Sequence, residues 1–242
     1  MVTIVLMIAG EEGIAIKELY YVLMKAGLGN VKQCKTMIRH QQVKVNNQMI
    51  EDIHLLVDDN DRIMVNHHKI KWPFVYYMLN KPKGYICASH DQKWPCVNEL
   101  ITDKDCYCLG RLDKDTTGLL IMTNDVSLSK RLLLPKNHVE KTYCVKVDHL
   151  LSNDLIESFV KGIVIDDHVL CRSAQLTIIN QYECYVTLSE GKYHQVKKMF
   201  LSCGYRVIEL KRMSFAGILL DENLNYGEYR CLNKNEFQKL EI

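Results

Sequence analysis

A charged turn that leads directly into an apolar segment is the feature that most constrains how this chain can fold. The turn covers residues 110–118, Gly-Arg-Leu-Asp-Lys-Asp-Thr-Thr-Gly, and the apolar run Leu-Leu-Ile-Met follows at 119–122. Such a run suits a buried strand and is too short for most helices. We therefore expect Arg111 and Asp113 to lie on a loop where a strand enters the core, a rigid place for a reactive carboxylate. The alternative is a surface turn whose aspartate hydrogen-bonds its own backbone.

Length and composition allow one large domain, or a medium domain with a small one. The chain has 242 residues, of which 48% are hydrophobic and 25% are charged, an ordinary globular balance. Its formal net charge is only +2. A role in nucleic-acid binding therefore depends on where the basic residues cluster and not on bulk charge.

The apolar run at residues 2–9 is too short to span a membrane, and it lacks the basic leader of a signal peptide. It continues into Glu11 and Glu12, and no later apolar run reaches spanning length. We expect a soluble, cytoplasmic protein with no membrane contact.

The ten cysteines are scattered, and no two of them have the spacing C-x-x-C. Cys106 and Cys108 form a lone C-x-C, a spacing that alternate residues of a strand also produce. Disulfides suit small secreted domains, and zinc sites need more closely spaced ligands. We therefore expect buried, reduced thiols.

The amino-terminal region reads as two helices followed by a small hairpin. Apolar periodicity predicts a helix from Ile14 to Ala26, ended by a glycine, and a second helix with a basic side from Val31 to His40. Val43–Ile50 reads as strand, turn and strand, and Arg62–Val65 as another strand. This makes a compact unit of about sixty residues, near the lower limit of what folds alone.

A polar stretch that ends before Pro73 marks a domain boundary. We expect a small domain over residues 1–66, a linker over 67–72 and a second domain over 73–242. The adjacent histidines His67 and His68 suggest metal binding, but no partner ligands follow at metal-site spacing. A solvated linker is the favoured interpretation.

The second region contains more strands than helices, and the two do not alternate regularly. The expected strands are Val75–Leu79, 85–88, 119–122, Lys141–Val147, Glu183–Ser189 and Tyr205–Leu210, and the expected helices are one capped by Asp125 and ending at Pro135, Ser152–Gly162 and Tyr193–Cys203. This pattern predicts an α+β domain with a mixed, largely antiparallel sheet.

Positive charge is concentrated in one segment of this near-neutral chain. Between Lys192 and Arg212 the only acidic residue is Glu209. The aromatic rings of Tyr193, His194 and Tyr205 are interleaved with this charge. Basic residues with rings among them suit a phosphate backbone whose bases stack. The alternative is a helix with a solvated basic side.

The amino-terminal pattern resembles the small αL RNA-binding domain of a small-subunit ribosomal protein and of many RNA-modifying enzymes. The likeness lies in the helical pair and in the hairpin over 43–50. The family usually opens with a basic Arg-Leu-Asp segment, where this chain has Lys17-Glu18. A packing domain with a solvated basic face is the alternative.

Three motifs of the second region together resemble a known enzyme family. They are Gly110-Arg111-Leu112-Asp113 with Thr116 and Gly118-Leu119-Leu120, then Lys141-Thr142-Tyr143, then Glu190-Gly191-Lys192-Tyr193-His194-Gln195-Val196-Lys197. In this order they resemble the RsuA-like branch of the RNA pseudouridine synthases. The likeness runs from Lys81-Pro82-Lys83-Gly84 to Gly227-Glu228-Tyr229. The Tyr193-His194 form is similar to that of enzymes acting on small-subunit (16S) rRNA, whereas enzymes acting on large-subunit RNA more often carry Asn-Arg there.

The resemblance implies roles for four residues. Asp113 matches the catalytic nucleophile or base, and Lys197 the cation expected to pair with it. Burial alone would raise the pKa of such a carboxyl, and a nearby cation opposes that. Tyr143 matches the active-site tyrosine that lies against the target base. Arg111 matches the residue that fills the space vacated by the flipped uridine or holds a flanking phosphate. The alternatives are a strand aromatic for Tyr143, a surface cation for Arg111 and a phosphate contact for Lys197.

The remaining basic and polar positions are expected to contact RNA. They are Lys81, Lys83, Lys192, Tyr193, His194, Gln195, Lys198, Lys211 and Arg212. Isomerisation of uridine oxidises nothing and donates no group, so no cofactor or metal is expected. We expect a monomer whose partner is ribosomal RNA or the pre-ribosomal small subunit.

Three alternatives stay open. Asp113 and Asp115 could form a glycosidase pair, but the neighbourhood is basic and no comparable turn holds a second acid. The chain could be a catalytically inactive RNA-binding or ribosome-assembly protein on the same fold. It could also be a synthase acting on 23S rRNA.

Overall fold

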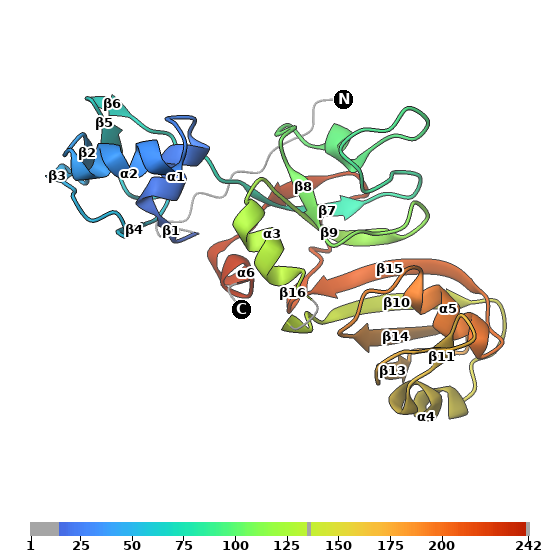
Figure 1. Ribbon diagram of the computed structural model, residues 1–242. Coiled ribbons are helices and arrows are strands. Elements are labelled where there is room, and N and C mark those ends of the chain that lie inside the picture. Colours follow the sequence, from blue (N-terminus) through green and yellow to red (C-terminus); the bar gives the residue numbers. More distant parts are fainter. Residues whose placement is uncertain (1–14, 135–136, 241–242) are drawn as a thin grey trace. The chain divides into compact units, whose positions relative to one another are not determined.

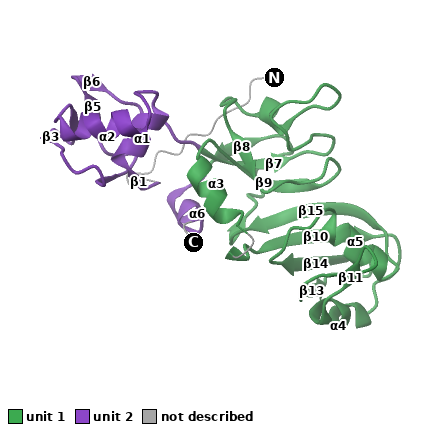
Figure 2. Ribbon diagram, in the orientation of Figure 1, with its two compact units in different colours: residues 1–6, 76–231, 242 green, residues 7–75, 232–241 purple. Residues whose placement is uncertain are grey.

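The computed structural model describes residues 15–134 and 137–240, and within them the chain forms two compact units (Figure 2). Unit 1 runs from Tyr76 to Cys231. Unit 2 contains the described residues 15–75 and 232–240. The expected run at 2–9 and the expected helix end at Pro135 lie outside the described residues.

Unit 2 is built on two short helices. Helix α1 is Leu19–Lys25, and helix α2 is Val31–Arg39. Each buries residues three or four positions apart, so one face of each helix packs inward. Asn30 caps α2 by accepting a hydrogen bond from the backbone N–H of Gln33, and the Gln33 side chain accepts one from Asn30.

Helix α1 begins at Leu19, so the expected start at Ile14 was wrong for the described part of that range. Residues Lys17–Glu18 form strand β1, which pairs with β4 (Leu56–Val57). The side chain of Glu18 accepts hydrogen bonds from the Tyr20 hydroxyl and lies 2.8 Å from His54 Nδ1. These contacts stabilise an extended backbone at Glu18, which is a tertiary effect that helical periodicity does not register.

The hairpin of unit 2 has the expected order. Strands β2 (Val43–Val45), β3 (Gln48–Met49), β5 (Ile63–Val65) and β6 (His68–Lys69) form an antiparallel sheet in the order β3-β2-β5-β6. Strand β6 lies within the range 67–72 that the sequence suggested as a linker. Its turn is made by Asn66 and His67, both with positive φ.

Unit 1 is organised by one large mixed sheet (Figure 1). Its strands are β7 (Tyr76–Lys81), β8 (Tyr107–Leu109), β9 (Thr117–Thr123), β10 (Lys141–Val147), β13 (Gln175–Ile178), β14 (Glu183–Leu188), β15 (Val207–Phe215), β16 (Ile218–Leu219) and β17 (Tyr229–Cys231). The main order is β13-β14-β10-β15-β9-β7-β17, and only β15 and β9 pair in parallel. The expectation of a mixed, largely antiparallel α+β sheet is confirmed.

Short elements complete unit 1. They are the 3₁₀ turn Val97–Leu100, α3 (Val126–Leu132), α4 (Asp154–Lys161), the hairpin β11 (Val164–Ile165) with β12 (Val169–Leu170), and α5 (Gln195–Ser202). The remaining helix, α6 (Lys234–Gln238), belongs to unit 2. Asp125 caps α3 as expected, by accepting the backbone N–H groups of Ser127 and Leu128.

Two boundaries in the basic segment differ from the sequence expectation. Helix α5 begins at Gln195, since His194 has a left-handed backbone (φ 52°) that a helix cannot contain. Strand β15 continues to Phe215, so Lys211 and Arg212 lie inside the sheet. Both differences change which basic side chains reach the surface.

The expectation of reduced cysteines is met by all ten thiols, which are free. Six of them are buried. In the described residues, no helix combines the length and the apolar character needed to cross a membrane.

Gly118 on β9 pairs with Arg212 on β15, where the two strands run parallel. Its φ is +98°, and a Cβ built on it would lie 2.3 Å from the carbonyl oxygen of Arg212. Side chains other than hydrogen are therefore excluded by both backbone conformation and space. This glycine brings the strand that follows the Asp113 turn close against the centre of the sheet.

Gly118→Ala should lower the free energy of unfolding by roughly 2–4 kcal/mol, since the methyl group adds a backbone clash to a strained φ. Urea unfolding of the purified chain measures this loss. Gly84→Ala is the matched control, because Gly84 has a similar φ of +96° but nothing within 4 Å of its Cβ position. Equal losses in the two variants would contradict the role given to close strand packing.

Candidate active site

The Asp113 loop, residues 110–116, lies between β8 and β9, where the sequence analysis expected it. Backbone hydrogen bonds fix its path: Thr116 N–H donates to the Asp113 carbonyl, and Gly84 N–H donates to the Lys114 carbonyl. The Leu112 N–H donates to Cys87 Sγ at 3.3 Å. The loop is thus held by its own turn and by the neighbouring segment.

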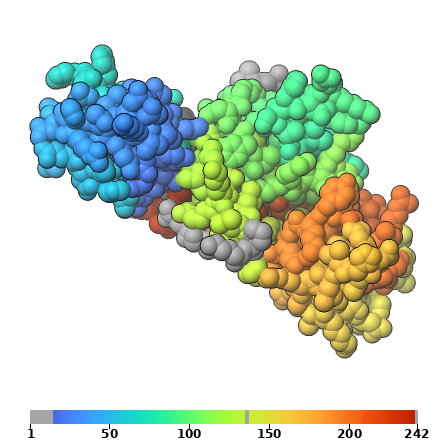
Figure 3. Space-filling view, viewed as in Figure 1, coloured from blue at the N-terminus to red at the C-terminus, as the bar shows by residue number. Residues whose placement is uncertain are grey.

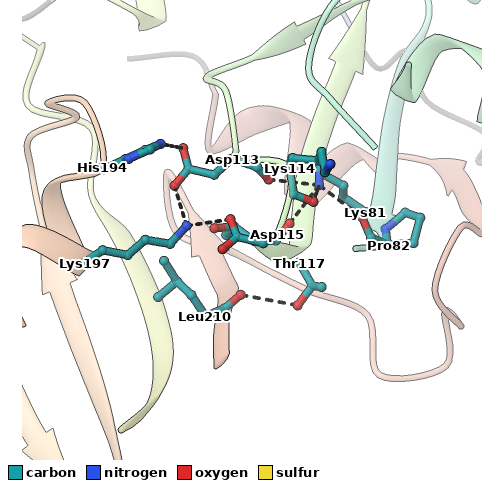
Figure 4. A network of polar contacts seen from close by, with 10 residues as sticks. Lys81, Pro82, Asp113, Lys114, Asp115, Thr117, His194, Lys197 and Leu210 are labelled. Atoms are coloured by element: carbon teal, nitrogen blue, oxygen red, sulfur yellow. Dashed lines mark hydrogen bonds and ion pairs between the residues drawn. The ribbon is translucent and has the colours of Figure 1, made fainter. Parts of the chain in front are cut away.

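Lys81 holds the loop from beneath. Its side chain is fully buried, and its Nζ donates to the carbonyl oxygens of Thr116 at 2.8 Å and Asp113 at 3.1 Å (Figure 4). Burial lowers the pKa of Lys81 below its ordinary value. The expectation that Lys81 contacts RNA was wrong, because β7 extends through Lys81 and turns its ammonium group toward backbone carbonyls.

An ion cluster joins this loop to α5. Lys197 Nζ lies 3.0 Å from Asp113 Oδ2 and 2.6 Å from Asp115 Oδ1 (Figure 4). His194 Nε2 lies 3.4 Å from the other carboxylate oxygen of Asp113. The pairing of Lys197 with Asp113 that the resemblance implied is present. Asp115 shares the same ammonium group.

Lys197 and Asp115 each favour the charged form of the other. Partial burial opposes ionisation of Asp115, but the hydrogen bond and charge of Lys197 outweigh it and hold the pKa of Asp115 below its usual value. Partial burial likewise disfavours the charged form of Lys197, but Asp115 and Asp113 outweigh it and raise the pKa of Lys197. The ammonium group of Lys197 is thus shared between two carboxyl groups, and Asp113 also lines the cavity.

A cavity of about 1010 Å³ opens beside the cluster. Asp113 lies in its wall, and Tyr143 on β10 lines it with only 9% of its surface exposed. Arg111, Lys192, Tyr193 and His194 also line the cavity, as the sequence analysis expected of residues around a substrate. A cavity of this size accommodates a nucleotide.

Tyr193 is strongly exposed at the cavity wall. Its side chain is 74% exposed and stacks on His194, with ring centres 3.8 Å apart. The left-handed backbone at His194 directs this stacked pair to the cavity before α5 begins. The segment around α5, orange in Figure 3, lies at the surface of unit 1.

Three residues named as RNA contacts or interleaved rings are buried. Burial contradicts the interpretation for Gln195 and Tyr205, whereas Arg212 lines the cavity, so its contact with RNA stays a prediction. Gln195 is 4% exposed, and its side chain binds Glu190 and the Lys192 backbone. Arg212 is 1% exposed, lies in the cavity wall, and its Nε donates to the Leu119 carbonyl at 2.7 Å. Tyr205 is 8% exposed and packs against Phe200 and His149.

The other three basic positions lie away from the cavity wall. They are Lys83 after β7, Lys198 on α5 and Lys211 on β15. Lys198 Nζ pairs with Asp166 at 2.5 Å and also lies 5.2 Å from the Tyr193 ring centre. Lys211 Nζ lies 5.4 Å from the Tyr226 ring centre. Their contact with RNA stays a prediction.

Glu190 holds the cavity rim together through its carboxylate, and no structural role was predicted for it from the sequence. Its carboxylate pairs with Lys192 Nζ at 2.6 Å, accepts the Arg172 backbone N–H at 3.1 Å and accepts the Gln195 side chain at 2.7 Å. A signal was available, since Glu190 directly precedes the glycine turn. The carboxylate fixes the start of α5 and so the position of Lys197.

Cys87 was also missed. Its thiol lines the cavity, and a hydrogen bond from Cys108, helped by the Leu112 N–H and the charges of Lys81 and Arg212, lowers its pKa below the ordinary value although burial opposes this. No spacing signal marks this cysteine. In the described residues, no group of three or more His, Cys, Asp or Glu could hold a metal ion.

The geometry can be compared with known families. A family model described as RNA pseudouridylate synthase matches residues 75–202, which is more than half of the chain. The chain belongs to the RNA pseudouridylate synthase family. Within this family it carries an additional module at the amino terminus, because an S4 domain model matches residues 19–63.

Individual family members match at substantial identity. The chain is 45% identical over 165 residues to ribosomal small subunit pseudouridine synthase A of Yersinia pestis, covering 66% of this chain and 70% of the relative. The corresponding protein of Haemophilus influenzae is 34% identical over 214 residues, covering 86% and 92%. A crystal structure of a pseudouridylate synthase matches with a TM-score of 0.67 and 32% identity, covering 92% of this chain and 98% of that chain.

RNA binding should weaken as the pH rises through about 8. Burial, with a smaller effect of Arg212, lowers the pKa of Lys141 in the cavity wall to about 8, so its positive charge is lost near that pH. Lys141→Gln should bind RNA more weakly at about pH 7 and should lack this step. Dissociation constants measured from about pH 7 to about pH 9.5 at constant ionic strength check this.

Titration of Lys141 changes the free energy of unfolding in the opposite direction from RNA binding. Between about pH 8 and the unfolded value of 10.5, the unfolded chain binds more protons at Lys141, so this residue makes stability rise with pH. Titration of Lys141 therefore does not weaken RNA binding by unfolding the chain in that pH range. Parallel pH profiles of RNA binding for the wild type and Lys141→Gln would contradict the assignment of the step near pH 8 to Lys141.

Proposed function

We propose that this chain converts uridine to pseudouridine at a specific position of ribosomal RNA, in 16S rRNA of the small subunit. The observation that carries the proposal is the Asp113 carboxylate, which lies in a cavity wall with Lys197 Nζ at 3.0 Å. The named relatives that act on the small ribosomal subunit support the choice of substrate. The proposed partner is ribosomal RNA or the pre-ribosomal small subunit, on which a cytoplasmic monomer acts.

The reaction exchanges one bond for another. The bond from the ribose anomeric carbon to the uracil nitrogen breaks, the uracil rotates, and the ring is joined again through carbon, from which a proton leaves. In this scheme Asp113 acts as the nucleophile or base, because it lines the cavity and Lys197 lies beside its carboxylate. Lys197 and Asp115 position that carboxylate.

The cavity supplies the other requirements of the chemistry. The target uridine has to leave the RNA stack, at a cost of roughly a few kcal/mol, before it reaches a half-buried carboxylate in a cavity wall. Tyr143 forms a wall against which the flipped base can lie, and it is placed to receive the proton from the rejoined carbon. Arg111 and Lys192, both in the cavity wall, offer positive charge to the flanking phosphates.

The S4 domain match supports a docking role for unit 2. Helix α2 carries Lys32, Lys35 and Arg39, and Lys32 and Arg39 are exposed. The departure at Lys17-Glu18 forms strand β1 and leaves this basic helix intact. We infer that unit 2 binds RNA outside the cavity of unit 1.

Asp113→Asn should abolish pseudouridine formation, a loss of at least about 1000-fold, because the amide cannot act as nucleophile or base. RNA binding should change little. The measurement is chemical mapping of pseudouridine in rRNA from cells lacking this protein, complemented with each variant.

Asp115→Asn is the matched control, since it removes the second carboxylate of the ion cluster but leaves Asp113 in the cavity. This variant should retain a measurable part of the activity. A map that does not change when the protein is absent would favour a non-catalytic RNA-binding protein. A change confined to 23S rRNA would overturn the proposed substrate.

A further inference from the structure

An exposed indole next to the Asp113 loop has no part in the chemistry described above. Trp94 is 40% exposed, and it lies on the connection between β7 and the 3₁₀ turn at Val97–Leu100. Large aromatic side chains are usually buried when they serve packing alone. An indole that stays in solvent beside a nucleic-acid site is available to a ligand.

The connection that carries Trp94 is well fixed. The Asp91 side chain accepts the backbone N–H groups of Lys93 at 2.8 Å and Trp94 at 2.9 Å. Ile86 N–H donates to the Pro95 carbonyl, and Val97 N–H donates to the Ile86 carbonyl. The indole is therefore held in place by the backbone of the connection and does not lie on a free loop tip.

Lys114 links the indole to the cavity. It follows Asp113 directly, it lines the cavity, and its Nζ lies 2.9 Å from the centre of the Trp94 ring. Lys93 Nζ lies 5.3 Å from the same centre. Trp94 itself does not line the cavity, so the indole lies one side chain beyond the cavity wall.

This arrangement matches the chemistry of one nucleotide. Lys114 Nζ already lies on the indole ring, so a base, whichever it is, stacks on the ring surface that this ammonium group leaves exposed, and the two ammonium groups attract the phosphate. Single-stranded and looped RNA offers unstacked bases, whereas a regular helix does not. The occupant is therefore an unpaired nucleotide next to the one that enters the cavity.

We propose that Trp94, with Lys114 and Lys93, forms a stacking platform that binds an unpaired nucleotide flanking the target uridine in RNA. The inference rests on the proposed function, since it places this nucleotide relative to a uridine in the cavity. The platform binds RNA and positions the target uridine relative to the cavity, so Trp94 is a positioning residue. Its removal weakens RNA binding more than it slows the step at saturating RNA.

The chain offers a direct probe, because Trp72 and Trp94 are its two tryptophans. In a Trp72→Phe chain, Trp94 is the only indole. Addition of unmodified 16S rRNA transcribed in vitro should quench its emission and protect it from acrylamide. Unchanged emission and acrylamide access at saturating RNA would overturn the proposal.

Substitutions separate stacking from mere proximity. Trp94→Leu should raise the dissociation constant for the same RNA roughly 5- to 100-fold, whereas Trp94→Phe, which keeps a ring, should lose less. Tyr185→Leu is the matched control: Tyr185 is also 40% exposed, but it lies on β14 opposite Cys144, one residue from Tyr143, and so on the other face of the sheet. Equal affinities of wild type and Trp94→Leu would overturn the platform.

The same assays distinguish failure of this inference from failure of the proposed function. If the wild type forms pseudouridine, and Trp94→Leu has the same rate and the same RNA affinity as the wild type, the platform alone is overturned. A wild-type chain that forms no pseudouridine would overturn the proposed function, and quenching of Trp94 with weaker binding of Trp94→Leu would then still support a nucleotide platform. Unfolding midpoints of all variants exclude loss of structure as the cause.

Discussion

One ammonium group shared by two carboxylates connects the parts of this site. Lys197 lies 84 residues after Asp113 in the chain, yet its Nζ contacts both Asp113 and Asp115. The contact fixes the Asp113 loop against α5, and the cavity lies beside this junction. Partial burial opposes the charges of Lys197 and Asp115, and their contact outweighs it, so each favours the charged form of the other.

The loop is also held from the side of the sheet. Lys81 is buried beneath it and donates to its carbonyl oxygens, an arrangement in which the positive charge is met by backbone dipoles. Gly118 lets β9 approach β15 closely just after the loop. Backbone contacts of the loop and the ion pair with Lys197 thus both position the Asp113 carboxylate. Such support suits a group that has to keep one geometry during a reaction.

Local sequence patterns were sufficient for part of this structure. The glycine, the charged turn and the apolar run predicted the loop before β9, and the predicted aspartate cap lies where α3 begins. The family resemblance implied that Asp113 and Lys197 meet. These features depend on residues close together in the chain, or on a resemblance that already contains the fold.

Features set by distant contacts were not predicted. Lys81, Gln195 and Arg212 are polar in sequence, and only the sheet and the turn before α5 show that they are buried. The left-handed backbone at His194 shortened α5, and strand pairing extended β15 through Lys211 and Arg212. Glu190 organises the cavity rim through contacts with Arg172, Lys192 and Gln195, which no local pattern contains.

The role of the shared ammonium is tested most directly by single-turnover kinetics of Lys197→Met, with Lys197→Arg as the variant that keeps the charge. The account predicts that Lys197→Met lowers the rate constant at saturating RNA by at least about 100-fold, while the dissociation constant changes by less than about 10-fold. Lys197→Arg should retain much of the rate. A Lys197→Met chain with an unchanged rate at saturating RNA, and a loss confined to binding, would contradict it, because Lys197 would then be only a phosphate contact.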